Sequence, residues 1–493
     1  MTAVTRTCNT TTVLLVLMSL GVIMAAPPAR AQEWRGRAST RAQYVELRPY
    51  RLDSVPVANT ALVGGRSTFN GRLVTCAPAA AYCFFYDSDE VVSTAPLVQD
   101  LDLSMWGFGV EGLRVYLSTR LRASLGDEEF WPRWDDHFDL IQGYVELKRD
   151  RYRFRLGRDF QVSGLGYYGY DGASAEVRFR QARIELEAYG GWGLARGLAE
   201  PVTSDALASL EEFQPRRRNY LFGFRASARP IPNGSIEAIY QKEIQTNRST
   251  IASERVAVDA SYRPIRDLSI EGHADYDLGT GWWGKAGATV GWSPISKLYV
   301  EGRLFRYRPV FDLQTIWAAF SPVPYTGYGL ALGIQPRSDL SIRLEGERRD
   351  YADTEAEVPF MVTTDRTWKA GASASWRAAR QVDVQGSYNL DFTFGSALSA
   401  GEARVNVRPL DRLSLGARFS AFQQLGEFRV GEGRVWSIGG NVTYDSPIGT
   451  VWGAVDRYRH DRRDPEAGLP DWNQLRASFG LAFYIGSEPG RRP

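Results

Sequence analysis

Apolar and polar residues alternate with a period of two along almost the whole chain, and this pattern limits the possible folds more than any other feature. From Leu113 to Ser124, every second residue is apolar or small, and most residues between them are Arg, Tyr or Ser. The segments 183–192, 268–277 and 475–485 show the same alternation. Because successive side chains of a strand point to opposite faces, each segment is predicted to be a strand with one apolar face and one polar face.

Counting such segments predicts about twenty-two strands, within a range of roughly 18 to 24. They lie at 36–48, 96–106, 111–125, 138–149, 150–159, 172–180, 182–192, 219–229, 235–244, 254–263, 267–277, 282–292, 297–307, 326–335, 339–350, 366–377, 381–392, 401–408, 412–422, 434–444, 450–460 and 473–485. Short connections that contain Pro, such as 263–268 and 335–340, alternate with longer polar ones, such as 308–325. Pro fixes φ at a turn, so the short connections are predicted to be tight hairpin turns. The predicted fold is all-β, with antiparallel strands in up-and-down order.

The first 31 residues have the pattern of a cleaved secretory signal. Arg6 precedes an apolar run from Val13 to Ala26, and Ala29-Arg30-Ala31 provides a small-residue cleavage site. Without Arg6 and Arg30, 57 basic side chains balance 57 acidic ones, so the overall charge does not indicate nucleic-acid binding. We therefore predict an exported chain with residues 32–493 as a single domain.

Strand length and aromatic spacing favour a membrane barrel over a soluble β-sandwich. The predicted strands span about 9–12 residues, the length needed for a tilted crossing of a bilayer. Aromatic residues lie at both ends of single apolar rows, at spacings that correspond to roughly 20–25 Å along the membrane normal. The expected girdle residues are Trp282 with Trp292, Trp368 with Trp376, and Trp436 with Tyr444. These features predict a transmembrane barrel in the outer membrane, in contact with its lipid.

The polar rows carry many charged residues, which we expect to face a water-filled lumen. The predicted inward-facing residues are Arg114, Arg120, Arg122, Glu146, Arg151, Arg153, Arg155, Glu176, Arg178, Arg183, Glu185, Glu187, Glu271 and Asp275. His273 and Asp275 are two residues apart on one strand and could form an acid–base pair. Residues two apart on a strand are neighbours by geometry alone, and no nucleophile stands beside them, so we interpret them as wall residues.

The chain as a whole resembles porin-type outer-membrane barrels of Gram-negative bacteria. Its most porin-like stretch is Tyr152-Arg153-Phe154-Arg155-Leu156-Gly157-Arg158-Asp159, followed by Gly164-Leu165-Gly166-Tyr167-Tyr168. One departure is at the C-terminus, where Gly486 to Pro493 follow the aromatic end of the last strand. An even number of strands implies that both termini lie in the periplasm.

A barrel of this strand number has a diameter of roughly 40–45 Å, so something is expected to narrow it. The plug domain of TonB-dependent transporters does not fit between the cleavage site and the first strand. We expect instead that 49–95, 193–218 or both fold into the lumen or cap the outer end of the barrel. Cys76 and Cys83 lie within 49–95 and are predicted to form a local disulfide.

Two functions are consistent with these features. The first is a porin-like channel for passive or substrate-selective diffusion of small hydrophilic solutes. The second is the barrel sheath of a porin–cytochrome electron conduit, which would hold a separate periplasmic or lumen-bound multihaem protein. The chain lacks a CxxCH haem motif and any four-ligand zinc spacing, so we predict no cofactor and no metal. No constellation of catalytic residues indicates an enzyme.

Overall fold

The computed structural model describes the chain from residue 33 to residue 486, apart from 48–49, 64, 71, 78, 89–90, 126–137, 195–218, 246–250, 309–323, 353–365, 394–395, 426–432 and 463–471. Twenty-two antiparallel strands form one closed barrel, which confirms the predicted fold class. The signal expected at 1–31 and most of the 193–218 loop lie outside the described residues. Among the described residues, no helix is long and apolar enough to cross a membrane.

The barrel strands correspond one to one with the predicted segments. They are β1 (Glu33–Leu47), β9 (Pro96–Trp106), β10 (Leu113–Ser124), β11 (Phe138–Lys148), β12 (Tyr152–Ser163), β13 (Gly166–Phe179), β14 (Ile184–Gly193), β15 (Asn219–Ala228), β16 (Gly234–Gln245), β17 (Ile251–Ile265), β18 (Leu268–Asp277), β19 (Trp282–Ile295), β20 (Leu298–Tyr307), β21 (Tyr325–Arg337), β22 (Leu340–Tyr351), β23 (Arg366–Ala379), β24 (Val382–Thr393), β25 (Ser396–Leu410), β26 (Leu413–Leu425), β27 (Gly433–Ser446), β28 (Gly449–Arg462) and β29 (Trp472–Gly486).

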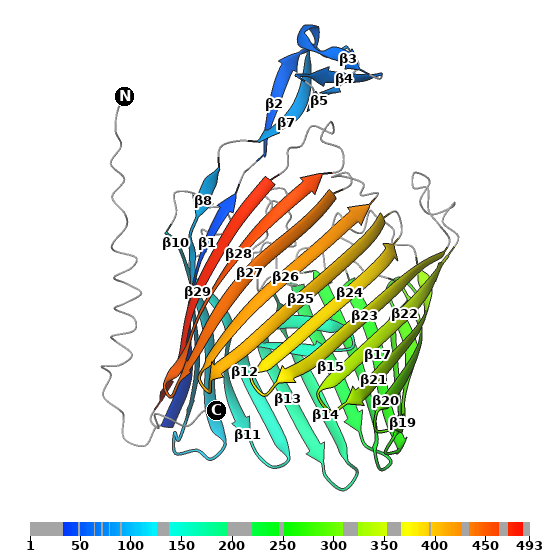
Figure 1. Ribbon diagram of the computed structural model, residues 1–493. Coiled ribbons are helices and arrows are strands. Elements are labelled where there is room, and N and C mark those ends of the chain that lie inside the picture. The colour runs from blue at the N-terminus through cyan, green and yellow to red at the C-terminus, as the bar shows by residue number, and fades with distance from the viewer. Residues whose placement is uncertain are drawn as a thin grey trace.

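Closure depends on the pairing of the first and last strands. β1 pairs with β29 from Arg35 opposite Gly486 to Val45 opposite Arg476, and its other edge pairs with β9. The connections at one end of the barrel are tight turns, and those at the other end are mostly longer (Figure 1). We call these ends the short-turn end and the long-connection end.

The predicted Pro turns are present, and each Pro lies where the pairing register shifts. In β17 and β21 the shifts fall between Tyr262 and Ile265 and between Ile334 and Arg337, the segments that contain Pro264 and Pro336. Pro has no N–H for the ladder, so it is accommodated at an irregular position beside the turn. At one of these turns Arg337 Nε donates to Asp339 Oδ1 at 2.9 Å, which holds the pKa of the Asp339 carboxyl below its usual range.

The two faces of the wall have opposite polarity. Large apolar side chains such as Leu156, Phe224 and Leu330 are 59–67% exposed on the outer face. Many inner-row charged side chains, among them Glu176 and Asp275, are at most 5% exposed. An apolar exterior and a charged interior suit lipid outside and water inside, whereas a soluble protein has the reverse arrangement.

The aromatic rows differ from the prediction at one position. Trp292, Trp368, Trp376 and Tyr444 are 42–49% exposed. On β19, however, the register shifts so that Trp283 opposes Tyr276 and Trp282 opposes Asp277. Opposed residues of an antiparallel pair share a face, so Trp283 continues the outward row and Trp282 does not.

The long first connection forms two small sheets beyond the barrel. β2 (Tyr50–Pro56), β7 (Tyr82–Ser88) and β6 (Thr75–Cys76) form one, and β3 (Ala61–Val63), β4 (Arg66–Phe69) and β5 (Arg72–Leu73) form the other. A one-turn 3-10 helix (Val57–Asn59) and β8 (Val92–Thr94), which pairs with β1, complete the segment.

Both small sheets stand above the long-connection end (Figure 1). Of the two expected placements of 49–95, the structure differs from the one inside the lumen and agrees with the one beyond the end of the barrel. The segment buries its own small core of Val55, Val74, Cys83 and Phe85, and Cys76 and Cys83 are joined by a disulfide. A segment with its own core does not need the barrel wall for burial.

We predict that Leu344→Arg, on the outward row of β22, destabilises the barrel by about 2–4 kcal/mol, because it places a charge in hydrocarbon. Unfolding by denaturant in lipid vesicles, followed by tryptophan fluorescence, measures the change. Ser373→Arg, on the polar face of β23, is the matched control and should alter stability by less than about 1 kcal/mol. Equal losses for the two variants would contradict the assignment of faces.

We also predict that Cys76→Ser/Cys83→Ser loosens the small sheets but leaves the barrel folded, because their strands pair with one another. Limited trypsin digestion should cut within 49–95 faster than in the wild type, while the heat-modifiable gel shift of the barrel persists. Wild-type protein treated with reductant should behave in the same way. Loss of the gel shift would show that the segment supports the wall.

Candidate functional site

The β12–β13 hairpin leaves the wall and folds into the lumen. β12 pairs with β11 only as far as Arg158, opposite Gly143, whereas it pairs with β13 up to Ser163, opposite Gly166. The sequence predicts two shorter strands here, 150–159 and 172–180, and most of this region lies between them. We call residues 159–171 the inner hairpin.

A row of glycines lies at the bend. Gly157 opposes Gly172, and Gly172 opposes Gly191 on the next strand. Gly157 has a φ of 135°, which other residues rarely adopt, and a Cβ on Gly172 would collide with the backbone of Gly190 and Gly191. Glycine permits such close approach and sharp bending of strands. The row therefore allows β12 and β13 to bend away from the wall where they pass close to β14.

Beyond Gly143, β11 no longer pairs with β12. Side chains at the base of the hairpin form hydrogen bonds with this part of β11 instead. Arg158 donates through one terminal nitrogen to the Leu140 carbonyl at 2.6 Å, and through Nε to Asp171 at 2.6 Å. Gln142 of β11 donates to Asp159 at 2.7 Å. A buried backbone carbonyl without a partner is costly, so Arg158 stabilises the point where the strands separate.

One face of the inner hairpin packs against the inner wall. Leu165, Tyr168 and Tyr170 form a buried cluster with Tyr189, Leu221, Ile239 and Ala257 of β14–β17. Tyr170 and Tyr189 stack with their ring centroids 5.7 Å apart, and Tyr189 donates to Gln241 at 2.9 Å. The opposite face is exposed, with Val162 60% and Tyr167 49% accessible.

Three wall residues of this cluster are apolar at positions where the sequence alternation predicts polar ones. Leu221, Ile239 and Ala257 occupy positions of the inward row, which is otherwise mostly polar. Apolar residues on a wet face are unfavourable unless something covers them. Three such residues on adjacent strands indicated a covering element, but only the assembled barrel shows which segment reaches them.

The hairpin tip is anchored to β17 and β18. Arg255 donates to the Leu165 carbonyl and to the Tyr168 hydroxyl, both at 3.2 Å, and pairs with Asp275 at 3.1 Å. A Cβ on Gly164 would lie only 2.5 Å from Asp259 Oδ2 and 2.7 Å from His273 Cε1. The tip is therefore held against the inner wall several strands away from β12.

His273 contacts two carboxylates beside this tip. Its Nδ1 lies 2.7 Å from Asp259 Oδ1, and its Nε2 lies 3.4 Å from Asp275 Oδ2. The structure thus places His273 and Asp275 next to each other, as the sequence analysis expected of wall residues. Asp259, on the neighbouring strand, is the contact that sequence spacing could not identify.

Many of the predicted inward charges form ion pairs at the base of the hairpin. Arg153 pairs with Glu176, Arg178 bridges Glu176 and Glu185 at 2.5 and 3.0 Å, and Arg225 reaches Glu187 at 3.2 Å. Arg155 contacts Glu146 and Asp159, both at 2.9 Å. These carboxylates are almost fully buried apart from Glu185, and buried charges need such partners to avoid a large desolvation cost.

The other predicted inward residues lie apart from this network. Arg120 pairs with Asp100 at 2.7 Å, and Arg122 pairs with Asp139. Arg114 opposes Glu146 in the register, and Arg151 lies in the turn before β12. Arg183 and Glu271 line a cavity on the inner wall, which Glu185 of the network also borders.

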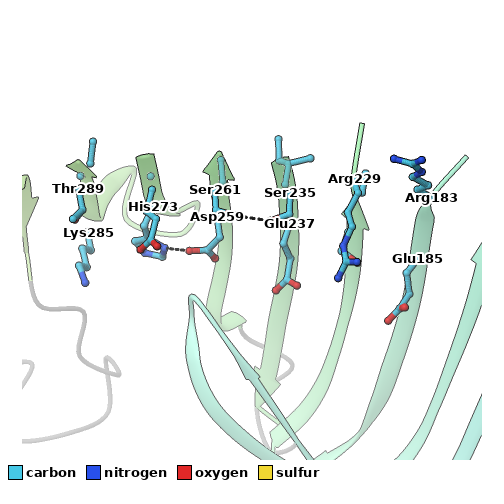
Figure 2. A pocket seen from close by; sticks show the side chains of 18 of the residues that line it. Arg183, Glu185, Arg229, Ser235, Glu237, Asp259, Ser261, His273, Lys285 and Thr289 are labelled. Carbon is cyan, nitrogen blue, oxygen red and sulfur yellow. Dashed lines mark hydrogen bonds and ion pairs between the residues drawn. The ribbon is translucent and has the colours of Figure 1, made fainter. Parts of the chain in front are cut away.

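That cavity has a volume of about 1210 Å³ and lies along β13–β20 beside the hairpin tip. Figure 2 shows basic and acidic side chains at its surface, including Arg183, Arg229, Glu237 and Lys285. Within the described part of the chain, Arg183, Arg229, Lys285 and Glu271 make no ion pair with another residue. The cavity therefore presents charges of both signs that can bind a polar solute.

No protein-family model matches the sequence, and no protein of curated function matches it. Solved structures of similar shape include the ferric enterobactin receptor PfeA of Pseudomonas aeruginosa, with a TM-score of 0.47, 9% identity and coverage of 93% of this chain and 82% of the receptor. OccAB1 of Acinetobacter baumannii has a TM-score of 0.38, 10% identity and coverage of 92% and 97%. OccK2 (OpdF) of Pseudomonas aeruginosa has a TM-score of 0.40, 10% identity and coverage of 92% and 98%. Because the identities are 9–10% and the TM-scores are below 0.5, these similarities say nothing about the function of this chain.

The closed wall with an apolar outside and a charged inside decides the class of protein. The chain is an outer-membrane β-barrel. Within this barrel, the inner hairpin and the adjacent cavity are the candidate functional site.

We predict that Arg255→Met weakens the attachment of the hairpin tip, because it removes hydrogen bonds from a charged donor, each worth about 1.5–3 kcal/mol. Amide exchange in residues 160–169 should become about tenfold faster or more, whereas exchange in β22–β23 should not change. Lys285→Met, which removes a cation from the same wall without a described contact to the hairpin, is the control. Equal exchange in Arg255→Met and wild type would show that apolar packing alone holds the tip.

Proposed function

We propose that this protein is a channel for small hydrophilic solutes across the outer membrane, and that the inner hairpin narrows its lumen. The hairpin is the observation that carries the proposal. It crosses the inner faces of β14–β16 and reaches β17 and β18. We further propose that the short-turn end faces the periplasm, so that both termini lie there and the two small sheets face the outside.

The charged surface of the cavity supports passage of polar solutes. Arg183 and Arg229, which form no ion pair with a described residue, lie in connections at the short-turn end, while Glu271 and Lys285 lie on β18 and β19. Charges of both signs can orient polar solutes without strong rejection of either sign. The exposed face of the hairpin adds Phe160 and Tyr167, whose ring centroids lie 5.0 Å apart, so part of the path is aromatic.

The sheath for a guest protein is the weaker alternative. A guest that fills the barrel would need the space along β14–β17 that the inner hairpin already occupies. The buried cluster and the Arg255 contacts hold the hairpin in that space. We therefore favour solute passage, and we assign no catalytic role to the described residues.

We predict that shortening the hairpin enlarges the channel. Asp159 opposes Tyr170, so replacing residues 160–169 by Asn-Gly would close the hairpin with a two-residue turn before it enters the lumen. Single-channel conductance in planar bilayers should rise severalfold over that of the wild type, because a wider passage carries more ions. Val162→Ala, which trims an exposed side chain and keeps the hairpin, should change conductance little.

Two results would contradict the proposal in different ways. If correctly folded wild-type protein gave no conductance, the channel function would be wrong. If the wild type conducted but the shortened variant conducted equally well, the channel would stand and the hairpin would not be its constriction. The heat-modifiable gel shift of every variant verifies that the barrel is folded.

A further inference from the structure

Three arginines gather on the outer, lipid-facing side of β27 and β28. Trp436 opposes Arg459, and Ile438 opposes Arg457, so both arginines belong to the outward row of Trp436, Ile438 and Tyr444. Arg434 is in the same row of β27, two residues before Trp436. Their inward neighbours are Ser437, Asp456 and His460, all of which are buried.

This cluster carries an excess of positive charge. Arg459 donates through Nε to Asp461 at 2.6 Å, and its side chain remains 53% exposed. Arg434 and Arg457 are exposed and form no ion pair with any residue that the structure describes. One carboxylate therefore faces three guanidinium groups, and the surplus charge has no described protein partner.

Arg457 lies closer to the apolar middle of the wall than the other two arginines. It lies one residue pair nearer to the middle of the strand than Trp436, among the exposed apolar residues Ile438 and Val455, which are 57% and 52% accessible. A cation among lipid-facing residues is unfavourable unless its long side chain reaches the polar headgroup level of the membrane, where anions are available. An anionic group at the level of Trp436 would meet this need.

The two ends of these strands differ. The cluster is at the long-connection end, close to where β27 begins and β28 ends (Figure 1). At the short-turn end of the same strands, the outward row consists of Leu413, Tyr444 and Val451. The outward cations of this part of the wall therefore belong to one leaflet only.

We infer that Arg434, Arg457 and Arg459 bind the phosphate of an outer-leaflet lipid headgroup. Guanidinium groups fork onto phosphate oxygens, and Trp436 provides the amphipathic ring that favours the headgroup level. Asn473, which opposes Arg459 on β29, adds a neutral donor beside them. The assignment rests on the proposed orientation, in which the long-connection end faces outward.

The test uses purified barrel in detergent and three probes: lipopolysaccharide, the same lipid after enzymatic dephosphorylation, and inorganic phosphate. The test variant is Arg434→Gln/Arg457→Gln/Arg459→Gln. The control is Lys242→Gln/Arg306→Gln/Arg348→Gln, which removes three outward cations from other strands at the same end. Native mass spectrometry and fluorescence titration measure the bound lipid and its Kd.

We expect the test variant to bind lipopolysaccharide at least about tenfold more weakly than the wild type, because each cation near an anionic surface contributes to binding. The control should bind as the wild type does, and dephosphorylation should abolish the difference between the test variant and the wild type. Equal binding by the test variant and the wild type would overturn the site, and so would equal loss in the control. Inorganic phosphate that binds as tightly as the lipid would show that the ligand is the free anion.

A separate measurement tests the orientation. Leu62→Cys places a thiol on a residue of the small sheets that is 78% exposed, and a membrane-impermeant maleimide should label it in intact cells. Labelling only after cell disruption would overturn the orientation and, with it, the assignment of the outer leaflet. Channel conductance does not depend on this cluster, so failure of the lipid site leaves the proposed function intact.

Discussion

The pairing of β1 with β29 is the constraint on which the rest of the structure depends. Lipid offers no hydrogen-bond partners to a free strand edge, so a membrane sheet must close on itself. Once closed, the wall has only an outside and an inside. Leu330 and Phe224 meet hydrocarbon while Glu176 and Asp275 are buried among polar partners. The same closure creates a lumen much wider than wall side chains can fill, and the inner hairpin occupies part of it.

The inner hairpin is an irregular element within an otherwise regular wall. Glycines at 157, 172 and 191 allow the bend, and Arg158 bonds the β11 carbonyl that loses its strand partner. Apolar packing on Leu221 and Ile239 and the Arg255 contacts then secure the tip. The hairpin thus combines a bend, a covered patch and a polar anchor, and each is provided by a different part of the barrel.

The alternation of apolar and polar residues predicted the regular strands of the wall, but it did not predict the places where the chain departs from that regular wall. Alternation identified every strand of the barrel wall, because the period of two is a property of each strand alone. It misassigned Trp282 because a register shift between β18 and β19 exchanges the faces of Trp282 and Trp283, and such a shift is a property of the pair. It also left most of the inner hairpin as a connection, since Tyr168 and Tyr170 are buried by residues from four other strands. The separate core of the 49–95 segment was not predicted either, because its residues come together only when the short strands of the segment pair.

By itself, the sequence determined the strand number, the order of the hairpins, the polarity of each face and the positions of the tight turns, because these follow from residues near one another in the chain. Only the tertiary structure decided which segment enters the lumen, which carboxylates surround His273 and which arginines share the outer face beside Trp436. These arrangements join residues on strands that are distant in sequence or offset in register. They arise only when the wall has closed and every strand has fixed its neighbour.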